Sequence, residues 1–405
     1  MAFLSGTHPD VGTASPSVSI HPELSSLRVA IVHDWFYVRG GAERVVEALA
    51  DIFPHADLFA LFARTETMAP NLRKRKLTTS WLQNIPAIHR FHRYTLILHP
   101  LALEQFNFNN YDLVISSVAS TSKGIITSPN TLHLCYCHSP MRYIWDMYSS
   151  YMRDMSPIDR LVFALTAHRI RLWDYSSSSR VDHFACNSQY VAARIEKFYR
   201  RSSEVIYPPV EVRSIQISNC QDDFYLAIGR LVGYKRFDLA IQACNRLGRR
   251  LKIAGSGPDL RKLKQMAGPS VEILGLISDD YKHDLLSKCR ALIFPGEEDF
   301  GIVPVEAQAH GRPVIAFQAG GALETVTGLQ PPSEGTHVPT GVFFAEQTVD
   351  SLVSAIERFE ENTDRFDAIA IRDNAMRFDA SVFRTRVIEF VERKIRERGR
   401  VTSSF

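Results

Sequence analysis

The segment that most constrains the fold is residues 294–326, which read FPGEEDFGIVPVEAQAHGRPVIAFQAGGALETV. The apolar run at 291–294 predicts the end of a buried strand, and an acidic loop follows it. Pro304 is predicted to open a helix. The N–H groups of the first helical turn have no partner within the helix, so a proline, which has no N–H, costs nothing there. Gly311 is a typical residue for the end of that helix.

A second strand is predicted directly after this helix, at 313–316, and Gly320-Gly321 then precede a helix at 322–326. The order strand, loop, helix, strand, glycine loop, helix is typical of a parallel α/β sheet. In such sheets ligands bind outside the carboxyl ends of the strands. Both loops are therefore predicted to lie at a binding edge.

Length and charge narrow the class of protein. At 405 residues the chain is longer than one hydrophobic core usually organises, so two domains are expected. The net charge is only +3, from 47 basic and 44 acidic residues, which argues against nucleic acid as a partner bound through bulk charge. Residues 1–26 are rich in Ser, Pro and Gly and predict a disordered leader and no signal peptide. The six scattered cysteines are interpreted as reduced core residues of a cytosolic protein.

The first half of the chain predicts one Rossmann-like unit. An apolar strand at 27–32 leads to Gly40-Gly41 and an amphipathic helix, although no G-x-G-x-x-G fingerprint is present. Another strand, at 131–137, ends at His138, which places this histidine at the binding edge. A lone histidine there is also compatible with a purely structural role.

A second Rossmann-like unit begins with the strand at 224–228, which ends in the sequence GRLVGYKR. Arg230 and Lys235 lie between that strand and the next helix. Arginine binds phosphate oxygens through two parallel N–H bonds and lysine supplies a compact charge, so the pair suits a diphosphate. Cations at a helix N-terminus oppose the helix dipole, which favours a functional reason for them.

Glu298 and Glu306 allow more than one interpretation. Paired carboxylates are what a glycoside hydrolase needs. With Pro304 as the first helical residue, however, Glu306 would be the third, where a carboxylate serves as a helix cap or turns toward a ribose diol. Gly320-Gly321 would add bare backbone N–H groups for an anion. Together these groups suit a sugar nucleotide.

The spacing Glu-x7-Glu within EDFGIVPVE, with GRPVIA and GGALETV after it, resembles the retaining GT-B glycosyltransferases of family 4. GRLVGYKR is similar to the family's donor-diphosphate motif and YCHSP to its sugar-contacting histidine. The resemblance implies a catalytic set and a donor-binding set of residues. The catalytic set is His138, Glu298, Arg230 and Lys235, and the donor-binding set is Gly40, Gly41, Arg230, Lys235, Phe300, Gly301, Ile302, Glu306 and Gly321. Asp299 stands where many members have glycine, and Gly233-Tyr234 replace a more polar turn.

The implied fold is α/β with GT-B architecture, in which two Rossmann-like domains face each other across a cleft. The predicted parts are a leader (1–26), an acceptor-binding domain (27–207), a nucleotide-sugar-binding domain (208–378) and a C-terminal helix (379–405) that packs back on the first domain.

The implied activity is retaining transfer of a sugar to a lipid-linked oligosaccharide in bacterial polysaccharide or O-antigen synthesis. The wording of the motifs favours mannose from GDP-mannose, with a polyprenyl-diphosphate-linked acceptor. A UDP-sugar donor, an epimerase or hydrolase on the same fold, and an inactive partner of a glycan assembly complex are the alternatives. No Asp-x-Asp occurs, so we expect neither a metal nor another cofactor, with fixed cations replacing the metal's charge.

Residues 73–94 interleave basic and aromatic side chains, including the block Arg73-Lys74-Arg75-Lys76. This mixture suits a segment that lies on an anionic membrane surface, and equally a helical insertion packed on its own domain. The chain has no run of roughly 20 apolar residues for a membrane span. The expected location is the cytoplasm, with peripheral attachment to the inner face of the plasma membrane as the further expectation.

Overall fold

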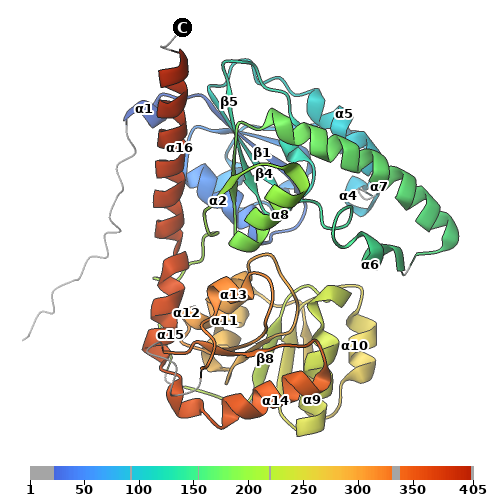
Figure 1. Ribbon diagram of the computed structural model, residues 1–405, viewed down its shortest axis with the longest axis vertical. Helices are drawn as coiled ribbons and strands as arrows, with labels where there is room; N and C mark the ends of the chain where they lie inside the picture. Colours follow the sequence, from blue (N-terminus) through green and yellow to red (C-terminus); the bar gives the residue numbers. More distant parts are fainter. Residues whose placement is uncertain (1–21, 92–93, 154, 219, 331–337, 403–405) are drawn as a thin grey trace, which may run out of the picture.

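The computed structural model describes residues 22–91, 94–153, 155–218, 220–330 and 338–402 and forms two α/β domains, one above the other (Figure 1). Each domain has an all-parallel sheet. The sequence predicts this fold class correctly. The strands are buried on both faces, as β1 (Val29–Phe36) shows, because helices cover both sides of a parallel sheet.

The N-terminal sheet has seven strands in the order β3-β2-β1-β4-β5-β6-β7. After β1 these are β2 (Asp57–Ala63), β3 (Leu77–Thr79), β4 (Leu113–Val118), β5 (Leu132–Cys137), β6 (His183–Cys186) and β7 (Ser203–Val205). The helices of this half are α1 (Pro22–Ser25), α2 (Gly41–Ile52), α3 (Pro70–Arg73), α4 (Ile88–Phe91), α5 (His99–Glu104), α6 (Tyr148–Arg153), α7 (Pro157–Ser177) and α8 (Gln189–Tyr199).

The C-terminal sheet has six strands in the order β10-β9-β8-β11-β12-β13. They are β8 (Tyr225–Ile228), β9 (Leu251–Ala254), β10 (Val271–Gly275), β11 (Leu292–Phe294), β12 (Val314–Phe317) and β13 (Gly341–Phe344). The helices that follow them are α9 (Phe237–Leu247), α10 (Leu260–Met266), α11 (Asp279–Lys288), α12 (Ile302–Ala309), α13 (Ala322–Thr325), α14 (Val349–Glu360) and α15 (Ala368–Ala375).

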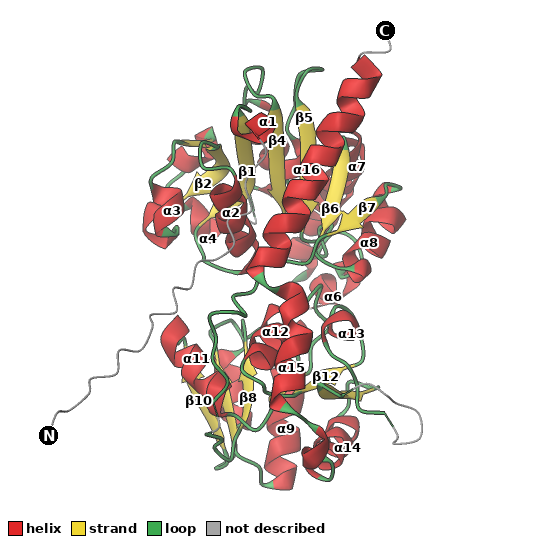
Figure 2. Cartoon of the chain, turned by 90° about the vertical axis from the view of Figure 1, so that its left-hand side faces the viewer, coloured by secondary structure: helices red, strands yellow, loops and turns green. Residues whose placement is uncertain are grey.

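The chain crosses between the domains twice, and the two crossings pair with each other. Val210 forms a parallel bridge with Asp379, and its carbonyl accepts a hydrogen bond from the N–H of Ala380. Helix α16 (Ala380–Thr402) then runs back along the N-terminal domain (Figure 2). Its Phe383, Val387 and Val391 are buried in the same cluster as residues of β1 and α2. The last helix therefore completes the core of the first domain.

The structure differs in part from two predictions, the disordered leader and the buried cysteines. Residues 1–21 lie outside the described residues, but Pro22–Ser25 form α1, and its Leu24 is buried in the N-terminal core. A disordered leader is therefore wrong for the stretch 22–25, because Leu24 packs into that core. All six cysteines are free, but Cys220 is exposed and so is not a core residue.

Candidate functional site

The loops that follow β1 and β11 meet between the domains. A Cβ built on Gly41 would lie 2.6 Å from Cδ1 of Ile302, so this glycine permits the N-terminal domain to touch the start of α12. Gly40 precedes α2, and its N–H donates to the Glu43 carboxylate at 2.9 Å. The structure thus brings Gly41 and Ile302 together, as residues of opposite walls of one cleft.

Helix α12 begins at Ile302 and not at Pro304, which corrects the sequence prediction. Gly301 caps it with φ +90°, in the left-handed region that favours glycine. Glu306 is therefore the fifth helical residue, too far inside the helix to cap its free N–H groups. Gly311, with φ +73°, follows the end of the helix as expected.

Glu298 and Lys235 form an ion pair at the carboxyl ends of β11 and β8. Lys235 Nζ lies 2.6 Å from Oε1 of Glu298, and both side chains are largely buried. Burial alone would lower the pKa of Lys235, but the charge of Glu298, its hydrogen bond to Lys235 and the nearby Tyr234 together outweigh burial and raise the pKa. Lys235 is therefore a fixed cation at neutral pH, held by a residue 63 positions away in the chain.

Two glycines, Gly296 and Gly229, pack closely against Lys235. A Cβ on Gly296 would lie 2.7 Å from Cα of Lys235, and one on Gly229 would lie 3.0 Å from its Nζ. Arg230 is exposed beside this group, and its charge opposes the protonation of Lys235, so the two cations lie within electrostatic reach of each other. Both predicted diphosphate ligands therefore lie at the same corner of the C-terminal domain.

Glu306 has a different environment, which sequence reasoning missed. It is buried, and its Oε1 accepts hydrogen bonds from Arg44 at 2.6 Å and Lys282 at 2.8 Å. Arg44 belongs to α2 of the N-terminal domain and Lys282 to α11, so Glu306 bridges the cleft. Burial alone would raise the pKa of Glu306, but the charges of Lys282 and Arg44 outweigh it and lower the pKa.

Gly320 and Gly321 are packed against the acidic loop and are not open to an anion. The N–H of Gly321 donates to the Glu298 carbonyl at 2.9 Å, so the prediction of a bare N–H at Gly321 is wrong. A Cβ on Gly321 would lie 2.3 Å from Cα of Phe300, and one on Gly320 would lie 2.4 Å from the carbonyl oxygen of Glu298. Their function is to let two backbones approach, which fixes the loop that carries Glu298.

Two arginines of the N-terminal domain hold this acidic loop, and neither was predicted. Arg194 donates to Oδ1 of Asp299 at 2.7 Å, and Arg142 Nη1 lies 3.3 Å from the carbonyl oxygen of Glu297. Phe300 is buried next to Tyr207 near the interdomain crossing. No local pattern marked these arginines, because the domains contact each other only after folding.

His138 lies at the end of β5, on the N-terminal wall of the cleft. Its Nε2 is 2.8 Å from Ser117 Oγ, and its carbonyl accepts a hydrogen bond from Asn187 at 3.0 Å. Burial, reinforced by the nearby His33, lowers the pKa of His138 to about 3. The ring is therefore neutral at physiological pH. The structure shows no direct contact between His138 and Glu298 or Lys235.

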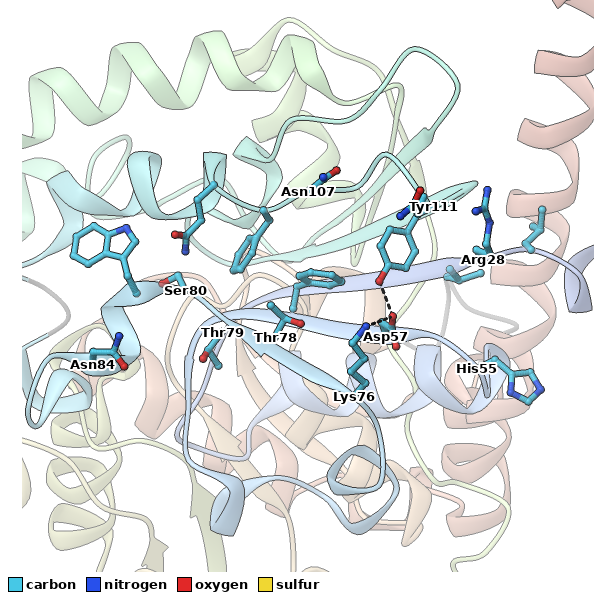
Figure 3. Close-up of a pocket in the computed structure, with 17 residues that line it drawn as sticks. Arg28, His55, Asp57, Lys76, Thr78, Thr79, Ser80, Asn84, Asn107 and Tyr111 are labelled. Carbon is cyan, nitrogen blue, oxygen red and sulfur yellow. Dashed lines mark hydrogen bonds and ion pairs between the residues drawn. The ribbon is translucent and has the colours of Figure 1, made fainter.

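Two cavities accompany these residues. One, of about 510 Å³, lies between the domains and is lined by Arg142 and Arg153 from one side and by Gly233, Tyr234 and Arg236 from the other. The other, of about 890 Å³, lies on the N-terminal domain, near the starts of β1 and β2. Figure 3 shows Lys76 and Tyr111 pointing toward Asp57 in it. The first cavity is lined by Gly233 and Tyr234 of the GRLVGYKR motif, so we place the site there.

No group of three or more His, Cys, Asp or Glu side chains among the described residues has a geometry that could hold a metal ion. Likewise, no helix in the described part of the chain is both long and apolar enough to cross a membrane.

Two parallel-sheet domains that face each other in this way define the GT-B class of glycosyltransferase folds. Residues 211–375 match the family model described as Glycosyl transferases group 1. The match covers the β8–β13 sheet and the loop that carries Glu298. The match lies within the C-terminal domain and spans less than half of the chain.

Curated relatives support the same class. The chain is 29% identical over 155 residues to an uncharacterized glycosyltransferase of Methanocaldococcus jannaschii, covering 37% of this chain and 44% of that protein. It is 25% identical over 304 residues to the alpha-1,3/1,6-mannosyltransferase ALG2 of Mus musculus (65% and 68%). With the Homo sapiens ALG2 it shares 30% over 221 residues (45% and 51%). The alignments with the archaeal and human proteins thus span about half of each relative.

Solved structures share the fold over most of the chain. Sucrose-phosphate synthase from Thermosynechococcus elongatus matches with a TM-score of 0.67 at 17% identity, over 91% of this chain and 100% of that one. HepE of Anabaena in complex with UDP matches with a TM-score of 0.65 at 15% identity, over 90% and 100%. At these identities the likeness establishes the fold alone.

Proposed function

We propose that the protein is a retaining glycosyltransferase that moves a hexose, mannose from GDP-mannose in the favoured form, to a lipid-linked oligosaccharide. The observation that carries the proposal is the buried Lys235–Glu298 pair, 2.6 Å apart, beside Arg230 in a group 1 domain. The ALG2 relatives, named as mannosyltransferases, support mannose as the sugar. Its role in bacterial surface polysaccharide or O-antigen synthesis is part of the same proposal.

In this proposal Lys235 and Arg230 stabilise the charge that grows on the nucleoside diphosphate as the sugar–phosphate bond breaks. Fixed cations in a site that excludes water act strongly and need no reorganisation during the reaction. Glu298 holds Lys235 in place and turns its second oxygen to sugar hydroxyls. The acceptor hydroxyl attacks on the face that the diphosphate leaves, and its proton passes to the departing diphosphate.

His138 remains neutral in this scheme, because the pKa of its ring is lowered to about 3. A neutral imidazole accepts or donates a hydrogen bond at the sugar without placing a second positive charge in the cleft. Glu306 must exchange Arg44 for the ribose of the donor, while Lys282 continues to neutralise it. We therefore propose that donor binding rearranges the Arg44–Glu306 contact between the domains.

Independence from a divalent metal is part of the proposal. It is supported by the two cations, Arg230 and Lys235, where the proposal places the diphosphate. Turnover in the presence of EDTA tests it, and loss of turnover that Mg²⁺ restores would contradict it. The cytoplasmic location predicted from the sequence stays a prediction.

A UDP-sugar is the second candidate donor, because solved structures of the same fold include Anabaena HepE with UDP-glucose. A screen that measures nucleoside diphosphate release from GDP-mannose, UDP-glucose and related donors, with and without a polyprenyl-diphosphate-linked acceptor, separates these cases. We expect release only with acceptor. Release from the donor alone would favour hydrolysis, and conversion of the donor to another sugar nucleotide would favour an epimerase.

Membrane attachment through residues 73–94 is less well supported than the sequence indicates. Arg73 donates to the carbonyls of Glu66 and Met68, and Arg75 donates to carbonyls near the end of α2. Lys76 pairs with Asp57 at 3.5 Å. Three of the four residues in the basic block 73–76 thus bind the backbone or a carboxylate of their own domain. The aromatic residues Phe91 and Tyr94 of the same stretch are exposed.

A further inference from the structure

Helix α7 exposes an apolar face that the rest of the described chain leaves uncovered. The α7 outer face consists of Ile158, Leu161, Val162, Leu165 and Leu172, each between 58% and 77% exposed. Figure 1 shows α7 as a long helix on the side of the N-terminal domain remote from α16. Large contiguous apolar patches on a protein surface usually mark an interaction site.

The exposed residues form a stripe and are not scattered. They recur at spacings of three, four and seven residues, which places them on one side of a helix. The opposite side of α7 is packed, since Ala167 and Ile170 are buried with Leu96 and Met141. At about 1.5 Å per residue, the stripe from Ile158 to Leu172 is about 21 Å long. The helix is therefore apolar on two sides, and only one is used by the fold.

A second exposed apolar group lies on the segment that packs against the inner side of α7. The 3-10 turn η3 (Leu96–Leu98) contacts α7, and its Leu96 is buried with Ala167 and Ile170. On that turn and beside it, Ile97, Leu101 and Tyr94 are 41%, 64% and 82% exposed. This part of the N-terminal domain thus exposes apolar side chains from two segments that are distant in the sequence.

The charges around the stripe indicate what covers it. Arg169 falls within the stripe, and Arg160 and His168 are exposed elsewhere on α7. Arg153 on α6 is exposed as well. Within α7 the single exposed carboxylate is Asp159, in the first turn, where Ser156 Oγ donates to it. An apolar stripe that contains an arginine, on a helix with one exposed carboxylate, suits a helix whose leucines enter a bilayer while its arginines reach anionic headgroups.

We propose that the α7 outer face docks the protein on an anionic lipid bilayer, lying in the plane of its surface. The proposal moves the predicted membrane contact from residues 73–94 to a helix that begins at Pro157. This membrane proposal does not depend on which sugar is transferred. If the protein bound vesicles but transferred no sugar, the proposed function would fail and the membrane proposal would not.

The test measures cosedimentation of the full chain with phosphatidylcholine vesicles, with and without phosphatidylglycerol. The variant Leu161→Ser/Leu165→Ser removes two exposed leucines that belong to no buried cluster of the described residues. The matched control, Leu276→Ser/Ile369→Ser, removes two apolar residues of the C-terminal domain that are at least as exposed. We expect the first variant to bind anionic vesicles at least about tenfold more weakly, and the control to bind like the wild type.

A second variant tests the charges. Arg160→Gln/Arg169→Gln should weaken binding to anionic vesicles and reduce its salt dependence, with little effect on neutral vesicles. Equal binding of Leu161→Ser/Leu165→Ser and wild type, with both variants folded by circular dichroism, would overturn the proposal. So would a change from dimer to monomer in size-exclusion chromatography without any change in vesicle binding, because the stripe would then cover a second copy of the chain.

Discussion

The two ends of the segment that carries Glu298 and Glu306 differ in what neutralises their carboxylates. Glu298 pairs with Lys235 of its own domain, whereas Glu306 pairs with Lys282 of its own domain and with Arg44 of the other. Glu298 lies in a loop at the cleft, and Glu306 lies inside a helix and is 4% exposed. The first pair lies within one domain, and the second joins the two domains.

The largest expected effect on stability is at the Glu306 end. Glu306→Ala removes the nearer carboxylate partner of the largely buried Lys282, which keeps only the exposed Asp279 at 3.5 Å, and should lower the free energy of unfolding by about 3–5 kcal/mol. Urea unfolding followed by circular dichroism measures this change. Glu346→Ala, an exposed glutamate of the same domain, is the control, with an expected change within about 0.5 kcal/mol. Equal stability of both variants would mean that the ion pairs of Glu306 with Lys282 and Arg44 contribute no net stability.

The largest expected effect on turnover is at the Glu298 end. Lys235→Ala should lower kcat about 10²–10³-fold, because a fixed cation is lost where charge develops. Lys264→Ala, an exposed lysine on α10, should leave kcat unchanged. Nucleoside diphosphate release measures both. Wild-type turnover by Lys235→Ala would show that the pair is structural, and the contrast between the two ends would disappear.

A smaller effect is expected at the glycine that supports the Glu298 loop. Gly321→Ala should cost about 1–3 kcal/mol of stability and reduce turnover, because its Cβ would lie 2.3 Å from the Phe300 backbone. Gly399→Ala is the control, since its Cβ would meet no atom within 4 Å. Thermal unfolding and donor turnover are the measurements. A tolerated Gly321→Ala would indicate that the loop moves freely.

The smallest effect is the response of the Glu306 end to acid. The pKa of Glu306 is lowered on folding, so its pairing stabilises the protein above the unfolded-state pKa of about 4.3 and this stability is lost as the pH falls through the folded-state value. The difference in unfolding free energy between wild type and Glu306→Gln should therefore be constant above about pH 5 and shrink as the pH falls below the unfolded-state pKa of about 4.3. Urea titrations at several pH values measure it, and a difference independent of pH would contradict the assignment.

Local sequence patterns located most of the secondary structure and one half of the site. GRLVGYKR and EDFGIVPVE placed Lys235 and Glu298 at the ends of neighbouring strands, where the fold brings them to 2.6 Å. The start of α12 was wrong by two residues, because the positive φ of Gly301 depends on how the loop packs and not on its composition. Arg44, Arg142 and Arg194 were missed because they act across the cleft.

The amino-acid sequence by itself determined the two parallel sheets, the edge at which their loops lie, and the cations Arg230 and Lys235 after β8. Strand and turn signals and short-range spacing are local properties of the chain. Only the tertiary structure decided the partners of Glu306, the packing of Gly321 on Phe300 and which face of α7 remains uncovered. These depend on contacts between residues that are far apart in the chain, and their geometry follows from how the domains and helices pack.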